Sequence, residues 1–158
     1  VRLGFKLEQL CYNIMIKAWA RVDNITRAES WLQRMVAAGF SPNKITYVTL
    51  MDGHARSGDL AGATAWFEEY RSHGGDWSIV FYNVFLKACS RARPREKQRA
   101  IDLISKMMRA DIEPNVITMK SLERVLGKDD TVELCDRLGI DWERTIKARY
   151  VDKVRYNR

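Results

Sequence analysis

The sequence lacks the cysteine pattern and the long hydrophobic run that mark several common classes of protein. Its three cysteines, Cys11, Cys89 and Cys135, have neither CxxC spacing nor histidine neighbours, so no disulfide framework and no zinc site are predicted. A reducing compartment is therefore favoured. No apolar run reaches the 18 residues that a membrane-spanning helix needs. The chain opens at Val1 without a hydrophobic signal region, and we expect it to be processed or truncated.

Residues for catalysis or cofactor binding are also scarce. The stretch HGGD at 73–76 lacks the spacing and the lysine of a phosphate-binding loop, and no HxE motif accompanies a CxxC pair as in zinc deaminases. Of the two histidines, His54 falls within the apolar pattern of a predicted helix and His73 within a turn. We therefore expect a protein that is not an enzyme, with no catalytic residue, no metal and no cofactor.

The chain does have enough apolar residues for one ordinary core, and it has an excess of positive charge. Hydrophobic residues make up 46% of its 158 residues, which is too many for a disordered chain. Lysine and arginine outnumber aspartate and glutamate by 27 to 20, which gives a net charge of +7. A surface of that sign favours polyanions or acidic lipid as partners.

An internal repeat organises the sequence. Tyr12, Tyr47 and Tyr82 are separated by 35 residues each, and Ala28, Ala63 and Ala100 follow in nearly the same register, 35 and 37 residues apart. The pair Pro42-Asn43 returns as Pro114-Asn115. Regular spacing of this kind is typical of repeat proteins. The sequence therefore predicts units at 9–43, 44–78 and 79–115, with a partial fourth unit at 116–127.

Each unit shows the apolar periodicity of two helices. Asn24 and Asp59 are placed to cap the second helix of their units, and Gly39 and Gly74 to end it. In the third unit two extra residues around Pro94 are expected to lengthen the loop or to shift the start of the second helix. One helical pair cannot bury its own apolar face, so we predict an all-α solenoid of stacked pairs.

The two ends of the chain are candidates for caps on this solenoid. Residues 1–8 precede the first unit, and residues 128–158 predict one helix from Thr131 and a second opened by Asp141. The second helix would have one apolar and one basic face: Trp142, Ile146, Tyr150 and Val154 against Arg144, Lys147, Arg149, Lys153 and Arg155. Capping is the simplest role, while contact with RNA, a membrane or a partner protein stays open.

The strings CYNIMIKAWAR, ITYVTLMDGHARSGD and VFYNVFLKACSR, with the 35-residue period and the recurring Pro-Asn, resemble the pentatricopeptide repeat family of P-type-like helical hairpins. Tetratricopeptide repeats have a 34-residue period and a different signature. The resemblance implies a right-handed solenoid in a chloroplast or mitochondrial protein whose transit peptide is absent from this chain. It also implies binding of single-stranded RNA, about one base per repeat.

The resemblance also implies which residues read bases. In the family a residue beside the first-helix aromatic and the last residue of the unit choose the base, which here gives Asn13 with Asn43 and Asn83 with Asn115. Such pairs resemble pyrimidine-preferring readers, because a carboxamide offers both a donor and an acceptor. Asn43 and Asn115 would equally suit a local turn role. The apolar residues expected to flank bases are Leu10, Ile45, Val80 and Ile117, which a buried packing role would explain equally well.

A column of cations is expected beside these readers. Asn13, Lys17 and Arg21 are four residues apart and so share a helix face. The candidate RNA-backbone residues are Lys17, Arg21, Arg56, Lys87, Arg91, Arg124 and Lys128. The alternative is that they are solvated cations at helix ends.

Two of the four units depart from the reader pattern. Val48 and Ser78 replace the asparagines of the second unit, and Asp52 stands where its neighbours have lysine. In the fourth unit Lys120 replaces the reader and Met119 the aromatic residue. We therefore expect a non-catalytic adaptor with sequence-tolerant RNA contact. The alternative is a structural subunit of a large organellar complex, such as a ribosome or transcription machinery, that docks mainly through protein contacts.

Overall fold

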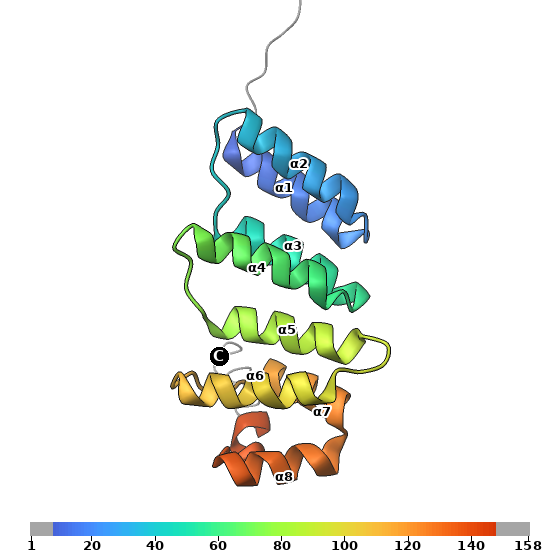
Figure 1. Ribbon diagram of the computed structural model, residues 1–158, viewed down its shortest axis with the longest axis vertical. Helices are drawn as coiled ribbons and strands as arrows, with labels where there is room; N and C mark the ends of the chain where they lie inside the picture. The colour runs from blue at the N-terminus through green and yellow to red at the C-terminus, as the bar shows by residue number, and fades with distance from the viewer. Residues whose placement is uncertain (1–7, 148–158) are drawn as a thin grey trace, which may run out of the picture. The chain divides into compact units, whose positions relative to one another are not determined.

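The computed structural model describes residues 8–147, and these form α-helices joined by short loops (Figure 1). The all-α class expected from the periodicity is confirmed. The chain divides into two compact units, with the boundary after Asp76 in the sequence, and each is described by itself below. Most of the predicted N-terminal cap and the residues Arg149, Tyr150, Lys153, Val154 and Arg155 of the predicted basic tail lie outside the described residues.

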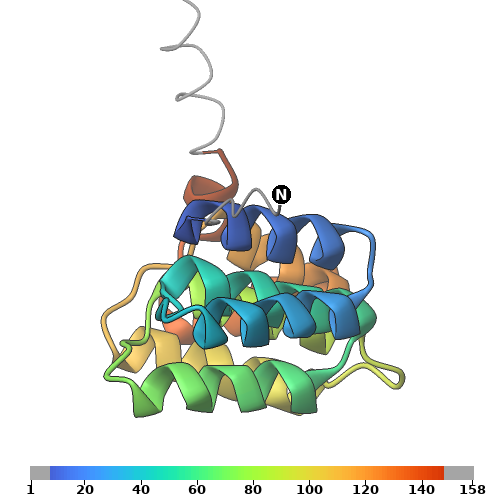
Figure 2. The same ribbon diagram turned by 90° about the horizontal axis from the view of Figure 1, so that it is seen from above.

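The first compact unit contains two helical hairpins. Its helices are α1 (Gln9–Arg21), α2 (Ile25–Ala37), α3 (Lys44–Ser57) and α4 (Leu60–Ser72). Helix α1 packs on α2 and on α3, α3 packs on α4, and α2 also contacts α3. Seen from above, the axes of these four helices are nearly aligned with one another (Figure 2). Two consecutive hairpins are therefore stacked with their first helices in contact.

The residues predicted to cap and end the helices of this unit do so in the structure. The side chain of Asn24 accepts a hydrogen bond from the amide of Arg27 at 3.1 Å, and that of Asp59 from the amide of Gly62 at 2.9 Å. Each bond satisfies an amide that has no partner within its own helix. Gly39 and Gly74 follow α2 and α4 with φ of 84° and 80°, a left-handed conformation that costs glycine little.

The core of the first unit explains why small residues recur in it. Ala28 and Ala63, each the fourth residue of a second helix, are completely buried. Gly53 in α3 lies close to α2, because a Cβ atom there would overlap the terminal methyl group of Ile25 unless that side chain shifted. Larger side chains fill the remaining space, with Ile16, Met35 and Leu50 fully buried. The hairpins therefore contact one another through interlocking small and large residues.

The second compact unit contains α5 (Ile79–Arg91), α6 (Lys97–Arg109), α7 (Val116–Leu126) and α8 (Lys128–Leu138). Helix α5 packs on α6 and α7, and α7 packs on α8 and α6. The two extra residues around Pro94 lengthen the loop between α5 and α6, which runs from 92 to 96, whereas α2 starts after residues 22–24. Ala100 remains buried as the fourth residue of α6, so the insertion leaves the helix register unchanged.

The fourth helical pair differs from the sequence expectation. We expected a partial unit ending at 127 and a separate helix from Thr131, but α8 begins at Lys128, directly after Gly127, and packs on α7. Gly127 has φ of 100° and makes this one-residue connection. Thr131 is the fourth residue of α8 and fully buried, the place that alanine holds in the other second helices. The repeat pattern did not predict this hairpin, because threonine replaces the alanine and only Gly127 separates the two helices.

The predicted cap of the following helix is confirmed. Asp141 accepts a hydrogen bond from the amide of Arg144 at 2.8 Å, and residues 142–147 are helical. Trp142 and Ile146 are half-buried, whereas Arg144 and Lys147 are exposed, in agreement with one apolar and one basic face. No helix in the described part of the chain is long and apolar enough to cross a membrane.

Candidate nucleic-acid interface

The first predicted reader pair comes together in the first compact unit. Asn13 lies in α1, while Asn43 is the N-cap of α3. Thr46 links them, because its Oγ1 lies 2.7 Å from Asn13 Oδ1 and 3.2 Å from Asn43 Oδ1. The backbone amide of Thr46 also donates to Asn43 Oδ1 at 3.1 Å. Two asparagines 30 positions apart in the sequence therefore share one hydrogen-bonded site.

The second pair is assembled in the same way in the second compact unit. Asn83 lies in α5, and Asn115 is the N-cap of α7. Asn83 Nδ2 donates to Asn115 Oδ1 at 3.3 Å, and Thr118 Oγ1 donates to Asn83 Oδ1 at 2.7 Å. The same arrangement of two asparagines and one threonine therefore forms twice, once in each compact unit.

Asn43 and Asn115 also have the local role that the sequence left open. Each accepts from the amide three residues ahead and belongs to a capping box, in which the threonine side chain accepts from the asparagine amide. Capping uses the Oδ1 atom and does not use Nδ2. The local role and a ligand-binding role are therefore compatible at these two residues.

The apolar residues expected to flank bases lie on the surface. Leu10 is 66% exposed, Ile45 65%, Val80 40% and Ile117 60%. A buried packing role for these four residues is therefore wrong. Each lies next to a reader pair: Leu10 is one turn before Asn13 in α1, and Ile45 is in the first turn of the helix that Asn43 caps. Exposed aliphatic side chains beside polar groups offer flat apolar contact to a ring.

The predicted cations do not all have the same surroundings. Lys17 and Arg21 are exposed on α1, and Arg91 and Arg124 are exposed in the last turns of α5 and α7. Lys87 is half-buried. The placement of these arginines at helix C-termini agrees with a favourable interaction with the helix dipole. Because their side chains are exposed, they are also accessible to a ligand.

Two of the predicted cations are placed differently from the expectation. The Nε and Nη2 atoms of Arg56 lie 3.1 Å from Asp23 Oδ1, and its Nη1 lies 3.8 Å from Asp52. Arg56 is therefore engaged by carboxylates, and its side chain is only 26% exposed. Lys128 was expected to continue the face of α7, but it is the first residue of α8, because Gly127 ends α7 at Leu126.

A cleft lies beside the second reader pair. It has a volume of about 770 Å³ and is formed by the turn between α6 and α7, the first turns of α7 and residues 139–145. Asn115, Ile117, Lys120 and Arg144 are among the residues that line it. The cleft therefore combines a carboxamide, an exposed aliphatic side chain and two cations within the second compact unit.

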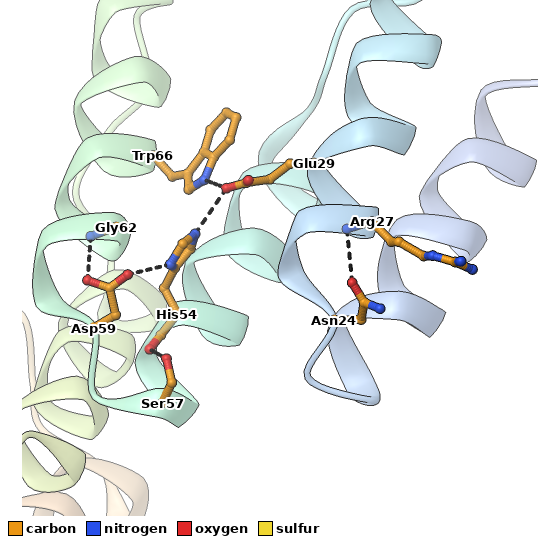
Figure 3. A network of polar contacts seen from close by, with 8 residues as sticks. All are labelled: Asn24, Arg27, Glu29, His54, Ser57, Asp59, Gly62 and Trp66. Atoms are coloured by element: carbon orange, nitrogen blue, oxygen red, sulfur yellow. Dashed lines mark hydrogen bonds and ion pairs between the residues drawn. The ribbon is translucent and has the colours of Figure 1, made fainter.

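The polar network around His54 is structural, as expected from its place in the apolar pattern. His54 Nδ1 lies 2.8 Å from Asp59 and Nε2 3.2 Å from Glu29, and Trp66 Nε1 donates to Glu29 at 3.0 Å (Figure 3). These contacts join α2, α3 and α4. The pKa of Asp59 is lowered, chiefly by its hydrogen bond from the Gly62 amide and further by His54. No sequence pattern linked Glu29 and Trp66 to His54, because they lie in other helices.

Cys89 and Cys135 are buried and lack the surroundings of a reactive thiol. Burial raises the pKa of both Cys89 and Cys135 to about 11, so their thiols stay protonated near neutral pH. Among residues 8–147, no group of three or more His, Cys, Asp and Glu side chains is arranged to hold a metal ion.

Comparison with known proteins agrees with this geometry. Models described as the PPR repeat family, the PPR repeat and the pentatricopeptide repeat domain match residues 8–56, 45–75 and 66–129. All three models describe repeats, and none describes a catalytic domain. The matches overlap and together run from residue 8 to residue 129, across both compact units.

The matches to individual relatives span much of this chain but only a small part of each relative. The chain is 31% identical over 103 residues to the chloroplastic pentatricopeptide repeat-containing protein At3g09650 of Arabidopsis thaliana, covering 64% of this chain and 13% of that protein. It is 26% identical over 126 residues to the mitochondrial 15S rRNA processing factor CCM1 of Vanderwaltozyma polyspora, covering 77% and 14%.

A solved structure shares the fold. The pentatricopeptide repeat protein PPR10, in complex with an 18-nt psaJ RNA element, superposes with a TM-score of 0.73 at 22% identity. The match covers 94% of this chain and 22% of PPR10. With three family models along the sequence and the same helical repeat in the fold, the chain belongs to the pentatricopeptide repeat family.

Proposed function

We propose that this chain binds single-stranded RNA without catalysis and serves as an adaptor in organellar RNA metabolism or gene expression. The observation that carries the proposal is the asparagine pair joined by a threonine, which forms in both compact units. The relatives support it: one is named as chloroplastic, one as a mitochondrial rRNA processing factor, and PPR10 was solved with RNA. We infer a chloroplast or mitochondrial location for this chain from the same relatives.

Each reader pair offers two kinds of contact to a base. The carboxamides of Asn13 and Asn43 provide polar groups for a base edge, and Leu10 and Ile45 provide exposed apolar surface for its ring. Asn83 and Asn115, with Val80 and Ile117, repeat the set. A good contact to a base edge contributes about 1–3 kcal/mol in DNA recognition. Two such sites give a modest base preference, for which we propose pyrimidines.

The exposed cations supply contact with the RNA backbone. Lys17 and Arg21 continue the face of α1 beyond Asn13, while Arg91 and Arg124 lie in the second compact unit. Neutralising phosphates releases counterions, so affinity falls as salt rises. Lys87 adds a half-buried cation near Asn83, whereas the ion pair with Asp23 makes Arg56 a weaker candidate. We expect most of the affinity to come from these charges and to be tolerant of sequence.

Fluorescence anisotropy tests the proposal directly. The chain is titrated into labelled oligo-U, oligo-C, oligo-A and a mixed duplex at low and physiological salt. We expect single strands to bind more tightly than the duplex, pyrimidines more tightly than oligo-A, and the replacement of Lys17 and Arg21 by glutamate to weaken all binding. The matched control replaces Lys106 and Arg109, exposed on the second helix α6, and should retain most of the affinity. Equal loss in both variants would count against an interface on the first helices.

A protein-docking role is the second candidate function. Ile14, Val22 and Val36 are 55%, 66% and 54% exposed on the first hairpin. A structural subunit of a large organellar complex would use such residues for protein contact. Lack of RNA binding at physiological salt, together with stoichiometric purification with protein subunits, would favour this role over the first.

A further inference from the structure

Thr46 and Thr118 occupy equivalent places in the two compact units. Each is the third residue of a helix that is capped by the second asparagine of a reader pair. Their exposed fractions are 1% and 0%. Cys11 and Phe81 hold this place in the other two first helices, and neither of these helices is capped by asparagine. A buried hydroxyl group therefore occupies this position in the two first helices that asparagine caps. Thr46 contacts Asn13 of the preceding first helix, and Thr118 contacts Asn83 in the same way.

The direction of that hydrogen bond follows from the distances. Thr46 Oγ1 accepts from the Asn43 amide at 3.2 Å, and its single hydrogen can go to Asn13 Oδ1 at 2.7 Å or to Asn43 Oδ1 at 3.2 Å. A separation of 2.7 Å is typical of O–H···O and short for N–H···O. The hydroxyl therefore donates to Asn13, and the oxygen of that carboxamide faces the protein interior.

The same reasoning holds in the second compact unit, where one more contact strengthens it. Thr118 Oγ1 lies 2.7 Å from Asn83 Oδ1 and 3.1 Å from Asn115 Oδ1. Asn83 Nδ2 donates to Asn115 Oδ1 at 3.3 Å, which requires the same orientation of the Asn83 carboxamide. Its remaining Nδ2 hydrogen is the one left for a ligand.

The capping asparagines also use their oxygens within the protein. Asn43 Oδ1 accepts from the Thr46 amide at 3.1 Å, and Asn115 Oδ1 accepts from the amides of Ile117 and Thr118 at 3.0 and 3.1 Å. All four carboxamide oxygens therefore accept from protein donors, which fixes the orientation of each carboxamide. The groups that each pair offers first to a ligand are its NH₂ groups, so the polar part of each site consists chiefly of donors.

We propose that Thr46 and Thr118 are specificity-determining positioning residues, which hold Asn13 and Asn83 so that the reader pairs present their NH₂ donors to a base. This role rests on the proposed RNA binding. A site that presents NH₂ donors matches a base edge with adjacent acceptors, such as N3 and O2 of cytosine. Uracil places an N3–H donor between its two acceptors and fits such a site less well. The sites therefore favour cytosine over uracil because the hydroxyls fix the carboxamides.

Isosteric substitution separates this role from capping. The double variant T46V/T118V removes both hydroxyls, T46S/T118S keeps them, and T64V is the control, because Thr64 donates to the Leu60 carbonyl within α4. The measured quantity is the ratio of affinities for oligo-C and oligo-U. We expect this ratio to fall about fivefold per site in the valine variant, to recover in the serine variant and to stay unchanged in T64V. Loss of affinity or melting temperature with an unchanged ratio would overturn the positioning role.

A second measurement does not depend on RNA. In protein labelled with ¹⁵N-asparagine, the side-chain NH₂ signals of Asn13 and Asn83 should shift when valine replaces the threonines and return with serine. Signals that stay unchanged would overturn the proposed orientation. If these signals respond but the wild-type chain binds no RNA, the RNA-binding function and the specificity role both fail, whereas the hydrogen-bond geometry is upheld.

Discussion

The guanidinium group of Arg56 in α3 lies 3.1 Å from the carboxylate of Asp23 in the loop after α1. The contact joins the loop after α1 to α3 within the first compact unit and reduces the positive charge that Arg56 presents. The side chain of Asp23 is 77% exposed, so the pair contributes little to stability, about 0–1 kcal/mol. Its larger effect concerns whether Arg56 is available to a phosphate group.

The first prediction is that D23N increases RNA affinity by releasing Arg56. Asn tolerates the positive φ of 58° at this position, so the backbone should not change. We expect a gain of about two- to fivefold in anisotropy titrations at low salt. D76N makes the same change in net charge at another exposed residue and serves as control. Equal gains in both variants would show that only net charge matters.

The second prediction concerns the exposed aliphatic residues. Replacing Leu10 and Ile45 with serine should weaken RNA binding and leave the melting temperature nearly unchanged, because substitutions at exposed positions usually alter stability by less than about 0.5 kcal/mol. Serine at Val22 and Val36, which are similarly exposed, is the matched control and should leave RNA affinity unaffected. A large drop in melting temperature for the first pair would indicate a packing role instead.

The third prediction concerns acid stability. Because the pKa of Asp59 is lowered in the folded state, the unfolded chain binds its proton first as pH falls. Asp59 therefore stabilises the fold above its unfolded pKa of about 3.8, and this contribution is lost as pH falls through the folded pKa. D59N retains an N-cap side chain but removes the charge. Urea midpoints measured between pH 6 and 2.5 should fall less steeply below pH 4 in D59N, and parallel curves would contradict this account.

The fourth prediction uses the close approach at Gly53. Alanine there should gain about 1 kcal/mol in helix propensity but collide with Ile25. We expect G53A to stabilise the protein when Ile25 is alanine and to gain less, or to destabilise, when Ile25 is present. A double-mutant cycle from urea unfolding should give a coupling energy above about 0.5 kcal/mol. Additive changes would mean that the Ile25 side chain moves aside without cost.

The fifth prediction concerns thiol reactivity. With a pKa of about 11, Cys89 and Cys135 are ionised only to about one part in a thousand at pH 8, and both are buried. Cys11 is half-buried. A disulfide reagent should therefore label Cys11 alone in the native protein and all three thiols in denaturant. Rapid labelling of a second thiol without denaturant would show that one of the compact units opens.

Local features of the fold could be predicted from the sequence because each depends on a few neighbouring residues. Asn24, Asp59 and Asp141 are short polar side chains at the start of an apolar pattern, and all three cap their helices. The fourth hairpin could not be predicted because its marker residue is Thr131 rather than alanine. Contacts between helices, such as that of His54 with Glu29, depend on packing that no local pattern specifies.

The candidate site was predictable in part. The family resemblance paired Asn13 with Asn43, and the structure places both side chains against Thr46. The threonine that joins them was not identified, although it follows both capping asparagines at the same distance, as Thr46 and Thr118. Nor was the ion pair of Arg56, because Asp23 is a loop residue whose place depends on the preceding turn.

The capping role of Asn43 and Asn115 limits how the proposed base preference can be altered. Each side chain holds the start of a helix and also belongs to a proposed reader pair. Substitution with a residue that cannot cap costs about 1 kcal/mol of stability, whereas Asp, Ser and Thr cap well. Recoding these positions is therefore confined to a few short polar side chains, and wider changes of specificity have to come from Asn13 and Asn83, which cap no helix.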